Sequence, residues 1–173
     1  GVDTTDSPDP TAVVLPGGLT ALDLGLGQDH SCAVLSDGTV ARWGDDDNGQ
    51  LGDGAAGTDS GDATLVPGLA AIVDVEAGGD TTCALDDLGQ VWCWGDDIDG
   101  QLGIGSTLDF ASPQPVGLPS AAQDVTLGDQ FTCALLVDDQ VYCWGEGSDF
   151  QVGSGDLVPV LLPIHVPGVP AVD

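Results

Sequence analysis

The chain has 173 residues and carries 29 acidic residues against a single basic one, Arg42, so its formal net charge is −28. Such a surface repels phosphate backbones and anionic lipids, which excludes nucleic acid and anionic membranes as partners. Hydrophobic residues make up 42% of the chain, enough for a packed core, and its 27 glycines and 11 prolines separate short apolar runs. This composition predicts an all-β protein with many tight turns.

Residues 1–10 are polar and contain proline, and we predict that residues 1–14 form an N-terminal extension or arm. From residue 15 onward, three short landmarks recur at steps of 51 and 50 residues. They are Cys32, Cys83 and Cys133, each followed by Ala; Trp43, Trp94 and Trp144, each followed by Gly; and Gln50, Gln101 and Gln151, each two residues before a Gly. We therefore predict repeats at 15–64, 65–115 and 116–165. Residues 166–173 then match the opening segment of a next repeat.

Each repeat reads as four short strands. In the second repeat, residues 73–75, 82–85 and 91–94 are rich in β-branched and aromatic residues. A fourth strand lies at 65–67 or at 113–116, where the prolines indicate an edge position. If Cys83 pairs with Cys93, a three-residue hairpin loop remains at 87–89. Gly89 then supplies the left-handed residue that such a loop needs, as Gly38 does in the first repeat and Asp139 in the third.

The same register places cysteines opposite each other. Opposed strand positions lie within disulfide distance, so we predict two disulfides, Cys83–Cys93 and Cys133–Cys143. Disulfides favour an oxidising compartment, which predicts a secreted, extracellular or cell-surface protein. Cys32 is opposite Arg42 instead, and it is either a buried free thiol or part of an intermolecular disulfide.

Aspartate-rich turns follow the first two Trp-Gly landmarks. Hard oxygen ligands beside a turn glycine suit Ca²⁺, although the full twelve-residue calcium-loop pattern is absent. Acidic residues in such number would equally serve solubility at high salt or the attraction of a basic protein. The candidate ligands are Asp45, Asp46, Asp47, Asp96, Asp97 and Asp99.

Nothing in the sequence predicts catalysis. The two histidines are His30 and His165, and His30 aligns with Thr81 and Phe131 in the other repeats. We therefore predict no catalytic residues, no enzyme activity and no cofactor other than the Ca²⁺ considered above. Four prolines within 158–172 interrupt the most apolar stretch, which argues against insertion into a membrane.

The segments 44–52, 95–103 and 145–153, with the Cys-Ala and Trp-Gly landmarks before them, resemble the regulator of chromosome condensation (RCC1) repeat family. The resemblance implies four-stranded propeller blades. It also implies a ring of about seven blades, as in other propellers, whereas three repeats form an incomplete propeller.

Blades cannot bury their apolar faces alone. We therefore expect neighbouring subunits to complete or extend the arc, unless the chain is one piece of a longer array. The first functional hypothesis is a non-enzymatic extracellular scaffold that assembles with copies of itself into a ring or filament. The alternative is a partner-binding propeller, such as a protein inhibitor or adhesin, with or without stabilisation by Ca²⁺.

Overall fold

The computed structural model describes residues 12–168. Most of the predicted arm at 1–14, and residues 169–173 of the predicted opening segment, lie outside this range. The described part contains one 3₁₀ helix, Pro16–Gly18, and twelve strands. The strands are β1 (Ala21–Leu26), β2 (His30–Leu35), β3 (Val40–Gly44), β4 (Ser60–Leu65), β5 (Ile72–Gly78), β6 (Thr81–Asp86), β7 (Val91–Gly95), β8 (Phe110–Pro115), β9 (Ala122–Leu127), β10 (Phe131–Leu136), β11 (Val141–Gly145) and β12 (Val160–His165).

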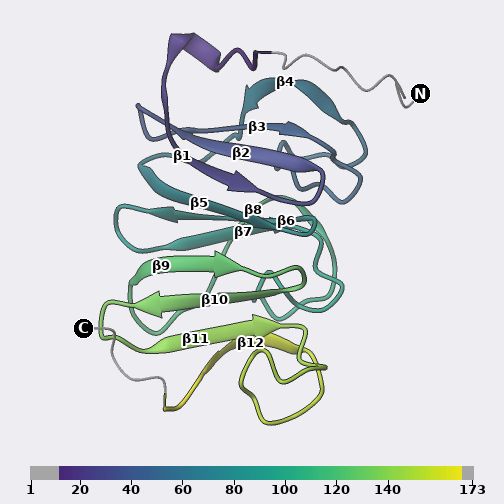
Figure 1. Ribbon diagram of the computed structural model, residues 1–173, viewed down its shortest axis with the longest axis vertical. Helices are drawn as coiled ribbons and strands as arrows, with labels where there is room; N and C mark the ends of the chain where they lie inside the picture. Colours follow the sequence, from purple (N-terminus) through teal and green to yellow (C-terminus); the bar gives the residue numbers. More distant parts are fainter. Residues whose placement is uncertain (1–11, 169–173) are drawn as a thin grey trace.

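The strands form three antiparallel sheets in which each strand pairs with the next along the chain. Their orders are β1-β2-β3-β4, β5-β6-β7-β8 and β9-β10-β11-β12. Figure 1 shows the three sheets stacked in sequence order along the longest axis of the molecule. The predicted all-β architecture of three four-stranded propeller blades is confirmed, and we call the sheets blades 1, 2 and 3.

The central hairpin of blade 2 has the predicted register. Cys83 is opposite Cys93, and Leu85 is opposite Val91. The backbone N–H of Asp86 donates to the carbonyl of Gln90 at 3.1 Å, which leaves the three-residue loop at 87–89. The third loop residue is left-handed in every blade, with φ of 78°, 81° and 62° at Gly38, Gly89 and Asp139.

The fourth strand differs from the prediction in its bounds. Strand β8 begins at Phe110, three residues before 113–116, and Leu65 is the last residue of β4 in blade 1 instead of the start of a strand in repeat 2. The Val66 N–H still donates to the Val40 carbonyl at 2.9 Å. Pro67 and Gly68 then turn the chain toward blade 2. The prolines after β4 therefore mark the passage between blades, whereas those within β8 lie on an edge strand, as predicted.

The hydrophobic core lies between the blades. Strand β5 contacts β1 and β2 of the preceding blade, and β9 contacts β5 and β6. One cluster joins blades 1 and 2 through residues such as Val34 and Val75, and another joins blades 2 and 3 through Leu85 and Val125. The first strands of successive blades therefore contact one another, and the fourth strand lies at the opposite edge of each sheet.

Candidate functional site

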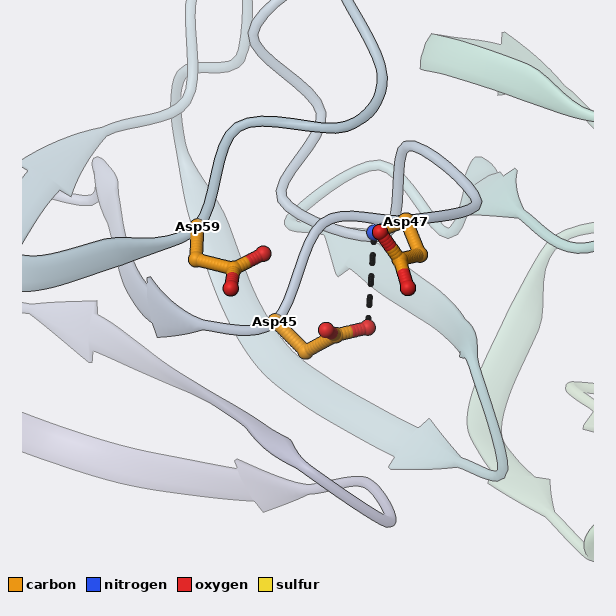
Figure 2. Close-up of side chains that lie close together, drawn as sticks. All are labelled: Asp45, Asp47 and Asp59. Atoms are coloured by element: carbon orange, nitrogen blue, oxygen red, sulfur yellow. Dashed lines mark hydrogen bonds between the residues drawn. The ribbon is translucent and has the colours of Figure 1, made fainter. Parts of the chain in front are cut away.

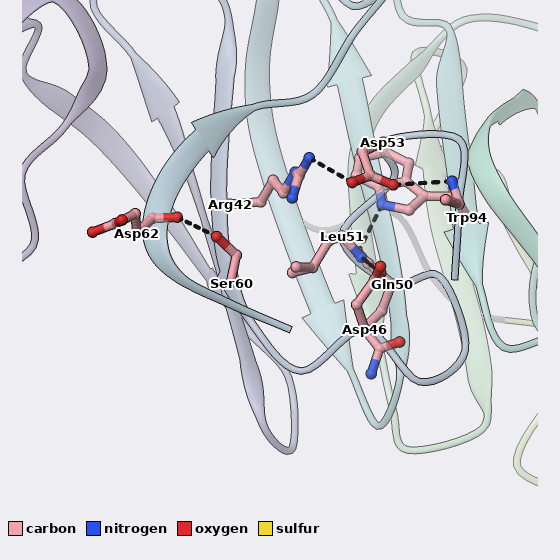
Figure 3. A network of polar contacts seen from close by, with 9 residues as sticks. Arg42, Asp46, Gln50, Leu51, Asp53, Ser60, Asp62 and Trp94 are labelled. Atoms are coloured by element: carbon pink, nitrogen blue, oxygen red, sulfur yellow. Dashed lines mark hydrogen bonds and ion pairs between the residues drawn. The ribbon is translucent and has the colours of Figure 1, made fainter. Parts of the chain in front are cut away.

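Each interface between blades contains a tryptophan that binds a backbone carbonyl of the blade before it. The indole N–H of Trp94 donates to the carbonyl of Gln50 at 2.8 Å (Figure 3). Thr82 donates its hydroxyl to the same oxygen at 3.0 Å. Trp144 repeats the arrangement on the carbonyl of Gln101, also at 2.8 Å. Two of the repeating landmarks thus meet across each interface.

The glycine of the third landmark makes room for this tryptophan. A Cβ at Gly52 would lie 2.6 Å from the indole nitrogen of Trp94, and one at Gly103 would lie 2.6 Å from that of Trp144. Both glycines also have positive φ. Trp94 and Trp144 are fully buried, so they serve packing between blades and offer no platform for a sugar.

Blade 1 exposes some of the positions that the other two blades bury, while Leu15, Leu19 and Trp43 pack against the buried cluster that contains its Ala33. Leu24 is 56% exposed, whereas its equivalents Val75 and Val125 are 0% and 1% exposed because the preceding blade covers them. Trp43 is only half-buried, since no blade precedes it in the structure. We call this surface the head face, and it consists of Ala21, Leu24, Leu26 and Trp43.

Blade 3 exposes the opposite half of the same interface. Leu135 is half-buried, whereas its equivalents Leu85 and Val34 are buried by the following blade. A shallow hollow of about 170 Å³ opens here on β9, β10 and β11, lined by Asp124, Val125, Thr126, Cys133, Ala134, Leu135 and Val141. We call this surface the tail face, and it consists of Cys133, Leu135, Val141, Val166 and the carbonyl of Gln151.

The six predicted calcium ligands do not lie together in a single site. Asp45 and Asp47 lie beside Asp59, which was not among the predicted ligands, with one carboxylate oxygen of each within 4.8 Å of the others (Figure 2). Asp45 also accepts a hydrogen bond from the backbone N–H of Asp47 at 3.3 Å. These three carboxylates are fewer than the six to eight oxygens that Ca²⁺ takes. Among residues 12–168, this is the one group of three possible ligands at such distances.

Asp46 and Asp97 point into the fold instead of toward an ion. The Oδ1 of Asp46 accepts from the Leu51 N–H at 3.0 Å, and the Oδ1 of Asp97 accepts from the Leu102 N–H at 2.9 Å. Both side chains are fully buried, and the second oxygen of each has no partner among the described residues. Their burial raises the pKa of both carboxyls, that of Asp97 to about 7.

The other two predicted ligands also serve the second loop itself. Asp96 accepts from the Gln101 side-chain amide at 2.7 Å, and the Asp99 N–H donates to the side-chain oxygen of Gln101 at 2.9 Å. Ile98 occupies the place that Asp47 holds in the first loop. The second loop therefore has no carboxylate at the position that Asp47 holds in the first loop.

A row of carboxylates on the first strands was also missed, although the repeat period reveals it. Asp23, Asp74 and Asp124 follow each other at steps of 51 and 50 residues on β1, β5 and β9. Burial, a hydrogen bond to Asp23 and nearby negative charges raise the pKa of Asp74 to about 7. Burial also raises the pKa of Asp23, but hydrogen bonds from Asp74 and from backbone N–H groups outweigh it, and the net shift is downward. The pKa values of the two carboxyls are thus shifted in opposite directions across the boundary of blades 1 and 2.

His30 is a structural residue. Its Nε2 lies 2.8 Å from the hydroxyl of Thr82. Since that hydroxyl donates to the Gln50 carbonyl, the histidine N–H must be the donor here. Burial lowers the pKa of His30 to about 4 despite the opposing charges of Asp45 and Asp29, so the ring is neutral and enclosed at neutral pH.

The cysteines lie where the register places them. Cys83–Cys93 and Cys133–Cys143 form disulfides. Cys32 is opposite Arg42 and is a buried free thiol, whose pKa burial raises to about 12. Arg42 is buried as well, and its guanidinium pairs with the Asp53 carboxylate at 3.2 Å.

Comparison with known proteins finds the repeat in residues 23–173. The sequence profile of the regulator of chromosome condensation (RCC1) repeat matches residues 37–85, 89–135 and 138–173, and a second profile of that repeat matches 23–50, 72–101 and 122–151. The human E3 ubiquitin-protein ligase HERC2 is 35% identical over 101 residues, which are 56% of this chain and 2% of the ligase. The Arabidopsis thaliana ultraviolet-B receptor UVR8 is 38% identical over 98 residues, which are 55% of this chain and 22% of the receptor. The chain thus spans a small part of each relative.

Solved structures show the same blades. Human WBSCR16 superposes with a TM-score of 0.77 and 25% identity, covering 90% of this chain and 42% of that protein. Yeast RCC1 (Prp20) bound to Kap60 superposes with a TM-score of 0.75 and 18% identity, covering 84% and 37%. The second likeness concerns the fold alone. Within residues 12–168, no helix has the length and apolar character needed to cross a membrane.

Proposed function

Because the chain belongs to the RCC1 repeat family, we propose that it is a non-enzymatic extracellular scaffold that assembles with copies of itself into a ring or filament. The observation that carries this proposal is the contrast between equivalent positions. Apolar side chains that are buried between blades are exposed at the two ends of the stack, as Leu24 and Val75 illustrate. A second copy would remove these side chains from water, which is favourable.

The chemistry of the chain supports a binding role over a catalytic one. Its one histidine within a blade interior, His30, is neutral and enclosed, and the chain has no lysine. The two disulfides suit an oxidising compartment, which supports a place outside the cell.

Negative-stain electron microscopy of the purified 173-residue chain tests this proposal. We expect rings or filaments built from repeated three-blade units. Images that contain only separate particles of the size of one chain, over the whole micromolar range, would overturn it.

The second candidate is a module that binds a basic protein, as an inhibitor or adhesin would. The net charge of −28 favours it. Propellers of this fold do bind other proteins: one solved structure contains yeast Prp20 bound to Kap60, and another is described with its binding to Gsp1p and histones. A pull-down with an immobilised lysine-rich peptide tests this candidate: retention at low salt supports it, and no retention removes it.

A further inference from the structure

We propose that copies of this chain join head to tail, with the head face of one copy on the tail face of the next. The inference rests on the proposed self-assembly and specifies its geometry. It follows from the two interfaces inside the chain, which are built from the same repeat positions. The open ends of the stack carry the two complementary halves of that interface.

The polar contact has one half at each end. Inside the chain, the Trp94 and Trp144 indoles donate to the carbonyls of Gln50 and Gln101. The corresponding donor at the head is the Trp43 indole, and the corresponding acceptor at the tail is the Gln151 carbonyl. Neither has a hydrogen-bond partner among residues 12–168. Joining head to tail would satisfy both groups.

The space beside that carbonyl holds the side chain of Val166 where the internal interfaces hold an indole. Val166 is the nearest side chain to Gly153, 2.8 Å from where a Cβ would lie. Its equivalents Val66 and Val116 are buried in the two internal interfaces, in the same clusters as Trp94 and Trp144. Val166 is only half-buried. An incoming Trp43 would therefore displace the Val166 side chain, which would then pack beside the indole as Val66 and Val116 do in the internal interfaces.

The apolar contact follows the same rule. In the first internal interface, Val75 of β5 packs with Cys32 and Val34 of β2 in one cluster. The corresponding partners at the ends are Leu24 on the head and Leu135 with Cys133 on the tail. Leu24 would thus enter the hollow on blade 3 and lose its exposure to water.

Pairing of like faces does not offer these contacts. Two head faces would place two indole donors together without a carbonyl acceptor, and two tail faces would place two carbonyls together without a donor. A heterologous contact satisfies both groups, and such contacts produce closed rings or open filaments. The head-to-tail arrangement therefore agrees with either form of assembly.

Blocking one face at a time tests this geometry. Leu24→Asp places a charge on the head face, and Leu135→Asp places one on the tail face. Leu22→Asp is the matched head control, because Leu22 is exposed and its equivalent Val73 stays exposed even with a preceding blade. Val137→Asp is the tail control, because Val137 lies exposed in a hairpin loop. Thermal melting of each variant establishes that it folds.

Sedimentation velocity at equal concentrations gives the readout. Each blocked variant alone should associate at least about tenfold more weakly than the unmodified chain, because the new charge would be buried without a partner. The two controls should associate normally. A mixture of the two blocked variants retains one intact head and one intact tail, so it should form a 1:1 dimer and nothing larger.

The outcomes separate the two proposals. If the Leu24→Asp variant alone assembles as the unmodified chain does, or if the mixture forms no dimer, the head-to-tail inference is wrong while self-assembly stands. If the unmodified chain stays monomeric, the proposed function itself fails. Trp43→Phe, which keeps an aromatic ring and removes the N–H, should weaken association by a smaller factor, and unchanged association would show that the hydrogen bond does not form.

Discussion

At the scale of single residues, Asp46 and Asp97 show how a loop acid can differ from its sequence neighbours. Each directly follows another aspartate, yet it alone turns inward to accept a backbone N–H from the Gln-Leu-Gly landmark. A run of aspartates carries no sign of which side chain turns inward. The conformation of the folded turn determines which aspartate is buried. The sequence alone therefore left all of these aspartates as candidate calcium ligands.

The buried second oxygen of Asp97 predicts a stabilising substitution. Asp97→Asn keeps an oxygen for the Leu102 N–H and removes the charge that burial disfavours. The amide nitrogen would still have no partner, but the charge that burial disfavours is gone, so we expect a net gain in unfolding free energy of about 1 kcal/mol at pH 8. Chemical denaturation measures it, with Asp87→Asn, at an exposed loop position, as the control that should change nothing.

The gain should depend on pH in a defined direction. Folding raises the pKa of Asp97 from 3.8 to about 7, so the protonated carboxyl is favoured in the folded state. Its contribution to stability is fully present below about pH 4 and is lost as the pH rises through about 7. The unfolding free energy of the variant should therefore exceed that of the unmodified chain at pH 8 and equal it near pH 4. An equal gain at both pH values would contradict the assignment.

At the scale of elements, the hairpins were predictable and the outer strands were not. Two cysteines ten residues apart, with a glycine or aspartate at the end of a three-residue loop, fix the register of β6 with β7. The fourth strands β8 and β12 contain prolines, and β4 consists mostly of small and polar residues, so the sequence did not indicate where these strands begin and end. Asp59 was missed because the long loop after β3 separates it from Asp45 and Asp47, and no landmark connects them.

The shared register predicts that blade 1 can accept a third disulfide. Cys32 is opposite Arg42 as Cys83 is opposite Cys93. Arg42→Cys should therefore join the new thiol to Cys32, although it removes the ion pair with Asp53. Thiol titration of the denatured, unreduced variant should find no free thiol, against one in the unmodified chain. Two titratable thiols after oxidative folding would show that the two side chains do not face each other.

Calcium binding stays a prediction, and it now concerns the first loop. If Asp45, Asp47 and Asp59 hold Ca²⁺, millimolar Ca²⁺ should raise the melting temperature relative to a chelator. Asp45→Asn should abolish the rise, and the matched change Asp96→Asn in the second loop should leave it intact. Equal melting temperatures with Ca²⁺ and with chelator would remove the idea, and the loop acids would then serve only solubility.

At the scale of the whole molecule, charge and apolar surface act in opposite directions. Every copy carries a net charge of −28, so copies repel one another through a medium of low salt. The head and tail faces are apolar and gain from association. The repeat period was enough to predict that the ends would be uncovered, but which side chains form them follows only from the stacking of the blades.

Salt should therefore have opposite effects on the two proposed kinds of binding. Raising the salt concentration from about 0.05 to about 0.5 M shortens the screening length and relieves repulsion between copies, so self-association should strengthen. Retention on a lysine-rich peptide should weaken over the same range, because that contact is an attraction between opposite charges. Self-association that weakens with salt would indicate a contact through charges instead of the apolar faces.

The central proposal is that further copies of the chain cover the apolar faces at the two ends of the three-blade stack. Its most direct test is the molar mass in solution, measured by light scattering on the eluting protein at micromolar concentration and moderate salt. The account predicts a mass of at least twice the 17.3 kDa of one chain, rising with concentration. A constant mass of 17.3 kDa over that range would contradict it.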